Sequence, residues 1–425
     1  MQIHVVQKGD SLYKLAQKYD VFINDIADAN EMDDENVLVI GQALIIPHEV
    51  SSHKVRAGET LWLIAQRYGI TLQELVAANK IANPALIHPG QTIVIPQAAR
   101  PTIEVNAYTE KFGPAGIKIV GETGQYLTYL SPFSYRIQAD GTLTALDDSA
   151  IIHKAYEKRA APMMVISNFE NGNFNPEIAH AIVANPAIQQ QLIANILATM
   201  KQKGYLALNV DFEYVPPADR ELYNAFLQNL VDSLHPQNYL VSTCLAPKLS
   251  ADQKGTLYEA HDYAAHGRIV DFVVLMTYEW GWAGGSPMAV APLNEVVKVV
   301  SYALSVMPPQ KIIMGMPLYG YDWTLPYVHG AKWAPTVSSK AAVNLANQYG
   351  ANIKYDAESQ SPYFNYYDKE GREHIVWFED ARSVQAKFNI VKTFNLRGVS
   401  YWVLGVPFPQ NWYALNANFT IKKLV

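Results

Sequence analysis

Two patterns of apolar and polar positions divide the chain near residue 100. Before that point, short alternating segments flank helical ones, in which apolar residues recur at every third or fourth position. After it, apolar runs rich in β-branched and aromatic residues alternate with helical patterns such as 185–203 and 294–307. The sequence therefore predicts small α/β modules at the N-terminus and one large alternating α/β domain after them.

The first hundred residues contain one pattern twice. Equivalent positions lie 49 residues apart without a gap: His4 and His53, Gly9 and Gly58, Asn30 and Asn79, Gly41 and Gly90, Pro47 and Pro96. Each copy predicts a strand, a helix that begins after a hydroxyl residue (Ser11 or Thr60), a second helix and a closing strand. We therefore expect two compact βααβ modules that need neither cysteine nor metal.

Both copies resemble the LysM family, in the Gly-[Asp/Glu]-[Ser/Thr]-Leu-[Tyr/Trp] opening at 9–13 and 58–62 and in the Ile-Pro ending. The resemblance implies binding to N-acetylglucosamine-containing glycans in peptidoglycan or chitin. Two weak sites on one chain would raise the effective concentration on such a polymer. The alternative is a pair of spacers that bind nothing. We expect the modules at 1–48 and 51–97, and a proline-bounded linker at 98–101.

The large domain, 102–425, contains eight apolar runs that predict strands. These are Ile103–Tyr108, Tyr126–Tyr135, Pro162–Asn168, Tyr205–Glu213, Tyr239–Ala246, Val270–Glu279, Lys311–Tyr319 and Arg397–Gly405. Most gaps are long enough for a crossover helix, which predicts a (β/α)8 TIM barrel after the two modules, hence an α/β fold class. The long gap at 322–393 indicates an insertion, in which Tyr355–Tyr367 predicts a hairpin.

Catalytic residues of such barrels lie at the carboxyl ends of the strands. In the fourth run, the period of two places Asn209, Asp211 and Glu213 on the face opposite Val210 and Phe212. Two carboxylates buried together raise the pKa of one of them, which supplies a general acid near neutral pH. The alternative is a structural ion pair with a nearby Lys or Arg.

Later strand ends carry aromatic and acidic residues suited to a sugar site: Met276, Tyr278, Glu279, Trp280, Tyr319 and Trp402. Together with the fourth run, they resemble glycoside hydrolase family 18. The segment Leu206–Glu213 aligns with that family's Asp-x-x-Asp-x-Asp-x-Glu strand, Met276–Glu279 with its Met-x-Tyr-Asp, and Trp402 with its last-strand tryptophan.

This resemblance implies a role for each matching residue. Glu213 would donate a proton to the glycosidic oxygen, while Asp211 would support the substrate's own acetamido group as the nucleophile. Tyr278 would hydrogen-bond that acetamido group, and the anomeric configuration would be retained. The substrate-binding residues would be Asn209, Glu279, Trp280, Trp402, Tyr319 and Met276.

The chain departs from the family pattern in three places. Leu206 and Asn209 stand where the family has aspartates, and Glu279 stands where it has a shorter acid. These changes leave the charge balance of the site and the contact made by Glu279 open. The intact Glu213 argues against the inactive, lectin-like members of the family.

Two LysM modules ahead of this barrel resemble a subgroup, the spore cortex-lytic N-acetylglucosaminidases of endospore-forming bacteria. That resemblance implies a peptidoglycan hydrolase that cleaves after N-acetylglucosamine in spore cortex. The reacting sugar must own a free acetamido group, so muramic acid or its lactam would lie on the leaving side. One alternative is a chitinase, and another, of a different class, is a non-catalytic glycan-binding spore coat protein.

The composition of the chain limits the classes of partner that the protein is expected to bind. The 33 Lys and Arg residues against 39 Asp and Glu give a net charge of −6, which argues against nucleic acid as a partner. We expect no membrane partner, no cofactor, a monomer, a buried Cys244, and His261 and His266 on the surface. The N-terminus lacks a signal-peptide pattern, so we expect deposition in the spore coat or cortex from the mother-cell cytoplasm.

Overall fold

The computed structural model describes residues 1–47, 52–68, 70–96 and 100–425. Eight parallel strands of the large domain close into a barrel, each hydrogen-bonded to the next and the last to the first. In order they are β5 (Thr102–Thr109), β6 (Tyr129–Pro132), β8 (Ala161–Ser167), β11 (Ala207–Asp211), β12 (Leu240–Leu245), β13 (Phe272–Leu275), β14 (Ile312–Pro317) and β20 (Gly398–Trp402). This confirms the predicted barrel.

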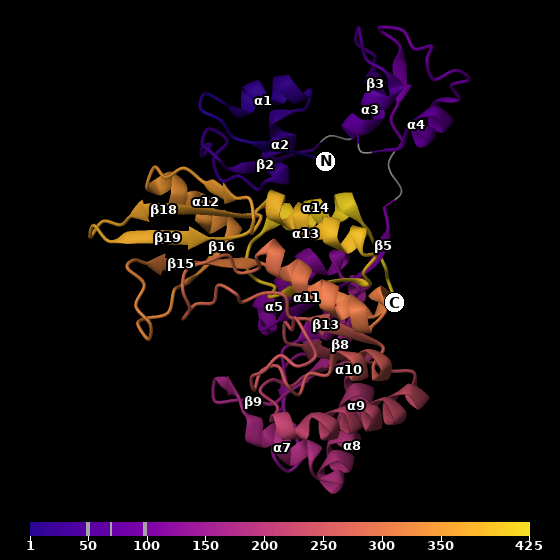
Figure 1. The fold of residues 1–425 in the computed structure, drawn as a ribbon, viewed down its shortest axis with the longest axis vertical. Helices are drawn as coiled ribbons and strands as arrows, with labels where there is room; N and C mark the ends of the chain where they lie inside the picture. The colour runs from indigo at the N-terminus through magenta and orange to yellow at the C-terminus, as the bar shows by residue number, and fades with distance from the viewer. Residues whose placement is uncertain (48–51, 69, 97–99) are drawn as a thin grey trace.

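Helices surround the barrel and cover its apolar outer face (Figure 1). They are α5 (Gly113–Thr123), α6 (Ser149–Glu157), α7 (Pro176–Val183), α8 (Pro186–Lys203), α9 (Arg220–Leu234), α10 (Tyr263–Ile269), α11 (Leu293–Val306), α13 (Ala381–Thr393) and α14 (Pro409–Asn418). The bounds of α8 follow from its sequence: Asn185 caps its first turn, and Gly204 ends it at a φ of 79°. No helix in the described ranges is long and apolar enough to cross a membrane.

Several strands are shorter than the apolar runs that predicted them. The second run forms two strands, β6 and β7 (Tyr135–Arg136), and β7 pairs beside β8. Short strands also extend the sheet or follow β8: β21 (Thr420–Ile421), β9 (Phe169–Glu170) and β10 (Asn173–Phe174). In the fourth run, the strand ends at Asp211, so Glu213 lies in the segment that leaves the sheet.

The insertion is an antiparallel sheet with one helix, which projects from the side of the barrel (Figure 1). It consists of β15 (Tyr319–Thr324), β16 (Thr336–Ser338), α12 (Ser339–Gln348), β17 (Lys354–Asp356), β18 (Ser361–Tyr367) and β19 (Glu373–Trp377). β17 and β18 pair antiparallel, which confirms the predicted hairpin. The predicted gap also holds α13, which packs in the barrel's helical layer.

The N-terminal repeats fold as two βααβ units. The first contains β1 (Gln2–Val5), α1 (Leu12–Tyr19), α2 (Ile23–Ala29) and β2 (Ala43–Ile46); the second contains β3 (Ser52–Lys54), α3 (Leu61–Tyr68), α4 (Leu72–Asn79) and β4 (Thr92–Val94). The hydroxyls of Ser11 and Thr60 accept backbone hydrogen bonds at the starts of α1 and α3, as predicted. Residues 98 and 99 of the predicted linker lie outside the described residues.

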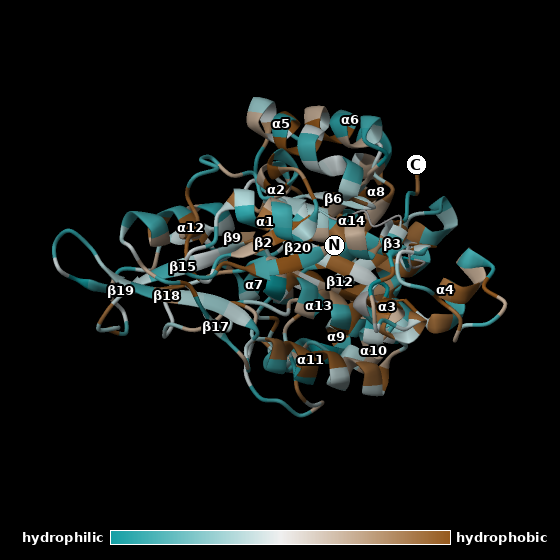
Figure 2. Cartoon of the chain, turned by 90° about the horizontal axis from the view of Figure 1, so that it is seen from above, coloured by the Kyte–Doolittle hydropathy of each residue, from teal (hydrophilic) through white to brown (hydrophobic). Residues whose placement is uncertain are grey.

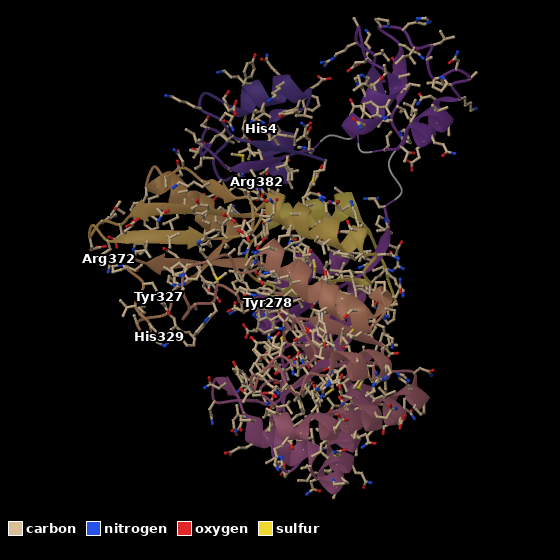
Figure 3. The ribbon with its side chains drawn as sticks, in the orientation of Figure 1. His4, Tyr278, Tyr327, His329, Arg372 and Arg382 are labelled. Carbon is tan, nitrogen blue, oxygen red and sulfur yellow. The ribbon has the colours of Figure 1, made fainter. Side chains whose placement is uncertain are left out.

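The first repeat docks on the catalytic domain, where α12, α13 and α14 meet it (Figures 1 and 3). Apolar residues Ala29, Ala43 and Ile45 join the barrel's core cluster. Polar contacts across this interface include Ile353 N to Ile40 O at 2.9 Å, Arg382 Nη2 to Gly41 O at 3.1 Å, Gln410 Nε2 to Asn30 Oδ1 at 2.7 Å and Lys340 Nζ to Asp33 Oδ1 at 2.6 Å. The repeat therefore packs as part of the catalytic body.

The second repeat has a core of its own. The hydrogen bonds described for it join its own residues, for example His53 to Glu59 at 2.6 Å. Hydrophobic residues lie along its helices α3 and α4 (Figure 2), and Trp62 is 53% exposed. The two repeats thus share a fold but differ in their packing against the barrel.

Candidate active site

The end of β11 places its side chains as the period of two predicted. Val210 and Phe212 are fully buried on the helix side, where the Phe212 ring stacks on Tyr223 and Phe226 of α9 with centroids 5.7 Å apart in each pair. Packing against α9 fixes the outward face, so the alternate residues, Asp211 and Glu213 among them, turn to the barrel interior.

Asp211 is 5% exposed, and its Oδ1 has no hydrogen-bond partner among the described residues. Burial raises the pKa of Asp211 to about 6, against a smaller lowering by a hydrogen bond from Cys244. Burial, and then the charges of Asp211 and Glu279, raise the pKa of Glu213 well above its ordinary value. At the mouth of the barrel, one carboxyl group is thus held protonated beside another.

The alternative of a structural ion pair does not occur. Among the ion pairs formed by described residues, none includes Asp211 or Glu213. Because a buried carboxylate without a basic partner is costly, this arrangement destabilises the fold, and a protonated carboxyl lessens the cost. Costs of this kind are typical of functional sites.

A buried polar network lies beneath the pair. Asn209 accepts a hydrogen bond from the Tyr108 hydroxyl at 2.9 Å and donates one to Ser242 Oγ at 2.9 Å. Cys244 contacts both Tyr108, at 3.2 Å, and Asn209, at 3.3 Å, and its burial in β12 confirms the prediction for it. Asn209 is completely buried, and its hydrogen bonds place it in the floor of the site.

Tyr278 follows β13, and Figure 3 shows it at the centre of the molecule. Burial raises the pKa of its phenol well above the ordinary value, as do the charges of Cys244, Asp211 and Glu213. Its ring packs on Gly315 of β14, where a Cβ would lie 2.8 Å from Tyr278 Cε1. The phenol therefore stays neutral and can donate a hydrogen bond beside the acid pair.

Glu279 adopts a left-handed backbone, with a φ of 68°. Although the residue is exposed overall, its Oε1 accepts hydrogen bonds from the phenols of Tyr319 and, at 3.0 Å, Tyr321. Burial of the carboxyl group raises its pKa, and the two phenols oppose that shift. Both tyrosines lie on β15, so the insertion positions this third carboxylate, and Tyr321 was not among the predicted site residues.

The other residues predicted to contact substrate, Trp402, Met276 and Trp280, lie at or shortly after strand ends and have partly exposed side chains. Trp402 ends β20 and packs edge-to-face on Phe133 with centroids 4.8 Å apart. Met276 packs against the same interior cluster as Trp402, while Trp280 packs against the outer core. These positions are compatible with a sugar-binding surface.

An exposed aromatic pair, Trp282 and Trp333, was not among the predicted site residues. Trp282 is 41% exposed and Trp333 is 64% exposed, and their rings meet edge-to-face with centroids 5.7 Å apart. A Cβ at Gly284 or Gly285 would lie 2.4 Å from the Trp282 ring, so both glycines are needed for its position. Trp333 belongs to the insertion, and its distance along the chain hid the pairing from sequence analysis.

The surface prediction for His261 and His266 is wrong: both are buried, at 1% and 0% exposure. His261 bonds to backbone groups of Ala246 and Phe212, while His266 packs edge-to-face on Tyr223 with centroids 5.0 Å apart. Burial lowers the pKa of His261 to about 4 and that of His266 to about 3. Both rings are therefore neutral, and the polar residues around them in sequence did not indicate exposure.

No group of three or more His, Cys, Asp or Glu side chains in the described ranges is arranged to hold a metal ion. The chemistry available at the mouth of the barrel is proton transfer from a carboxyl group, stabilisation of charge by a second carboxylate, and hydrogen bonding from phenols. An acid pair among aromatic rings at the strand ends of a parallel barrel is suited to hydrolysis of a glycosidic bond.

Comparisons with known proteins agree that the chain hydrolyses glycosidic bonds. The chain belongs to the glycosyl hydrolases family 18, whose family model matches residues 143–406, and the LysM domain model matches residues 4–47 and 53–96. The cortical fragment-lytic enzyme of Bacillus subtilis (strain 168) is 51% identical over 430 residues, which cover 100% of this chain and 99% of that one.

Solved structures extend the likeness to the fold. The spore cortex-lytic enzyme SleL of Bacillus megaterium QM B1551 superimposes with a TM-score of 0.90 at 43% identity, covering 100% of this chain and 99% of that one. A chitinase from Chromobacterium violaceum ATCC 12472 reaches 0.69 at 27% identity and covers 75% of this chain and 99% of its own. The chain is thus a glycoside hydrolase with LysM modules at its N-terminus.

Proposed function

We propose that the protein is a peptidoglycan hydrolase of spore cortex that cleaves the glycosidic bond after N-acetylglucosamine. The observation that carries this is the buried Asp211, whose Oδ1 has no hydrogen-bond partner among the described residues, beside the half-buried Glu213 with its raised pKa in a family 18 barrel. Full-length likeness to proteins described as cortical fragment-lytic or spore cortex-lytic supports the substrate class. The LysM modules, with limits at 1–48 and 51–97 ahead of a catalytic domain at 102–425, anchor the enzyme to the polymer.

The reaction proceeds with the substrate's acetamido oxygen as nucleophile. Glu213 gives its proton to the glycosidic oxygen as the bond to the anomeric carbon breaks, and the acetamido oxygen forms the new bond as an oxazolinium ion. Asp211 stabilises the positive charge on that ring, and Tyr278 orients the acetamido group. Water, deprotonated by Glu213, then opens the ring with overall retention of configuration.

The environment of Glu213 suits this cycle. Its raised pKa keeps the proton available near neutral pH, and the same site accepts a proton from water in the second step. Glu279, held by Tyr319, keeps a second negative charge near the acid and contacts substrate together with Trp280, Trp402 and Met276. The enzyme acts as a monomer without a cofactor in the spore coat or cortex.

Mass spectrometry of digested cortex fragments tests this function. Wild-type protein is expected to release products that end in reducing N-acetylglucosamine, and Glu213→Gln to release none. The matched control is Glu110→Gln, at an exposed glutamate outside the site, which should digest like wild type. Faster cleavage of chitin oligomers than of cortex fragments would favour a chitinase. Binding without cleavage by every variant would favour a glycan-binding coat protein.

A further inference from the structure

The backbone that carries Glu213 lies beyond the hydrogen-bonded registers of the barrel. β11 pairs with β8 as far as Asp211 opposite Ser167, and with β12 only as far as Val210 opposite Thr243. The peptide groups that follow are buried, since Phe212 is fully enclosed. Buried backbone groups outside a ladder need side-chain partners.

Asn168 supplies partners on the side of β8. It is fully buried and directly follows that strand. Its Oδ1 accepts a hydrogen bond from the backbone N–H of Glu213 at 3.0 Å, and its Nδ2 donates to the carbonyl oxygen of Glu213 at 2.8 Å. Nδ2 also donates to the carbonyl oxygen of Asn175 at 2.9 Å. One amide thus holds both backbone groups of the acid.

His261 supplies a partner on the side of β12. Its Nδ1 accepts from the backbone N–H of Ala246 at 2.8 Å, so its proton is on Nε2, which donates to the carbonyl oxygen of Phe212 at 2.9 Å. A neutral ring preserves this tautomer, and burial lowers the pKa of His261 to about 4. The peptide just before the acid is therefore tied to the segment after β12.

Among the described residues, an asparagine amide holds both backbone groups of a strand residue in two further places. Asn30 holds the backbone N–H and carbonyl of Ile45 at 2.9 and 2.8 Å, and Asn79 holds those of Val94 at 2.6 Å each. In those modules the amide fixes the closing strand to the second helix. At Asn168 the backbone so fixed belongs to the proposed acid.

We infer that Asn168 and His261 are positioning residues that together form a backbone clamp on Phe212–Glu213. The clamp holds the segment from two sides, from the residue after β8 and from the segment after β12, before Tyr214 turns the chain away at a φ of 55°. It sets the height and direction of the Glu213 carboxyl group relative to the sugar. The inference rests on the proposed function for the identity of the acid and adds the residues that aim it.

Kinetics on soluble cortex fragments test the clamp in the full chain. The variants are Asn168→Ala, which removes the amide, and two replacements of His261. Gln places its amide nitrogen where Nε2 lies and keeps the bond to Phe212, whereas Asn reproduces Nδ1 and loses that bond. The control is Asn418→Ala, a buried amide that bonds to Gln385 in the outer helical layer.

Misplacement of the acid lowers kcat rather than substrate binding. Asn168→Ala and His261→Asn are expected to lose ~10²-fold in kcat. KM should stay within about threefold of wild type, since ground-state contacts remain. His261→Gln should keep kcat near wild type, and Asn418→Ala should lower only the melting temperature.

Equal kcat for the two His261 variants, or wild-type kcat in Asn168→Ala, would overturn the clamp. If Asn168→Ala does not fold, the two His261 variants decide the question alone. Full activity of Glu213→Gln would instead overturn the identity of the acid, so the two failures are distinguishable.

Discussion

Replacing Gly41 by Ala tests whether the first repeat is locked to the catalytic domain. Gly41 has a φ of +85°, and a Cβ built on it would lie 1.8 Å from the backbone oxygen of Ile353. Its equivalent in the second repeat, Gly90, has a φ of +89° and nothing within 4 Å. Both substitutions incur the left-handed backbone cost of about 1–2 kcal/mol, but only the Cβ of Gly41→Ala collides with the catalytic domain, at its insertion.

The additional loss follows from the contacts that must open. Real Cβ contacts essentially never fall below 3.0 Å, so the two backbones have to separate by roughly an ångström. That separation breaks the hydrogen bonds from Ile353 N to Ile40 O and from Arg382 Nη2 to Gly41 O. Each contributes about 0.5–1.5 kcal/mol, so Gly41→Ala should weaken docking by about 1–3 kcal/mol beyond Gly90→Ala.

Amide hydrogen exchange measures this difference directly. The amide of Ile353, bonded to Ile40 in the first repeat, should exchange about tenfold faster in Gly41→Ala for each 1.4 kcal/mol of lost docking. Gly90→Ala should leave that amide unchanged while destabilising the second repeat. Equal protection of Ile353 in both variants would refute the reasoning, because the collision would then be absorbed without opening the interface.

Gly315→Ala would place a Cβ 2.5 Å from the Leu275 backbone oxygen and 2.8 Å from the Tyr278 ring, so the segment that carries Tyr278 must shift. In a folded protein kcat/KM should therefore fall by about tenfold, and a wild-type value would contradict the packing argument. Because the pKa of Glu213 is raised in the folded protein, ionisation of Glu213 destabilises the fold as pH rises above 4.5, the ordinary pKa of a glutamate. Glu213→Gln should therefore have a higher melting temperature than wild type at pH ~8 and the same melting temperature at pH ~4. A difference that does not change with pH would count against the raised pKa. Lys387→Met leaves the buried Glu379 carboxylate without its ion-pair partner, Lys387 Nζ, which lies 2.8 Å away. The substitution should lower the free energy of unfolding by about 3–5 kcal/mol in denaturant titrations. A change below about 1 kcal/mol would show that the ion pair is dispensable.

Local pattern predicted the parts of the site that lie on one strand. The period of two across Asn209, Asp211 and Glu213 separated the polar face from Val210 and Phe212, and the structure has the same separation. Such alternation is written in consecutive residues, so no knowledge of distant contacts is needed.

The positioning of the acid could not be predicted in this way. Asn168 and His261 lie 45 and 49 residues from their backbone partners in Glu213 and Phe212. His261 stands among polar neighbours that indicate a surface position, yet closure of the barrel buries it between two strand ends. Tyr321 and Trp333 reach the site from the insertion for the same reason.

The repeats mark the division between sequence and tertiary structure most clearly. The sequence by itself determined two equivalent βααβ modules, the order of strands and helices and the acid pair, because each depends on patterns that repeat or alternate along the chain. Gly41 and Gly90 are equivalent in sequence and in φ, yet one abuts Ile353 and the other meets nothing. Only packing against the insertion, α13 and α14 decided that the first repeat is part of the catalytic body, since docking depends on the surface that the rest of the chain presents.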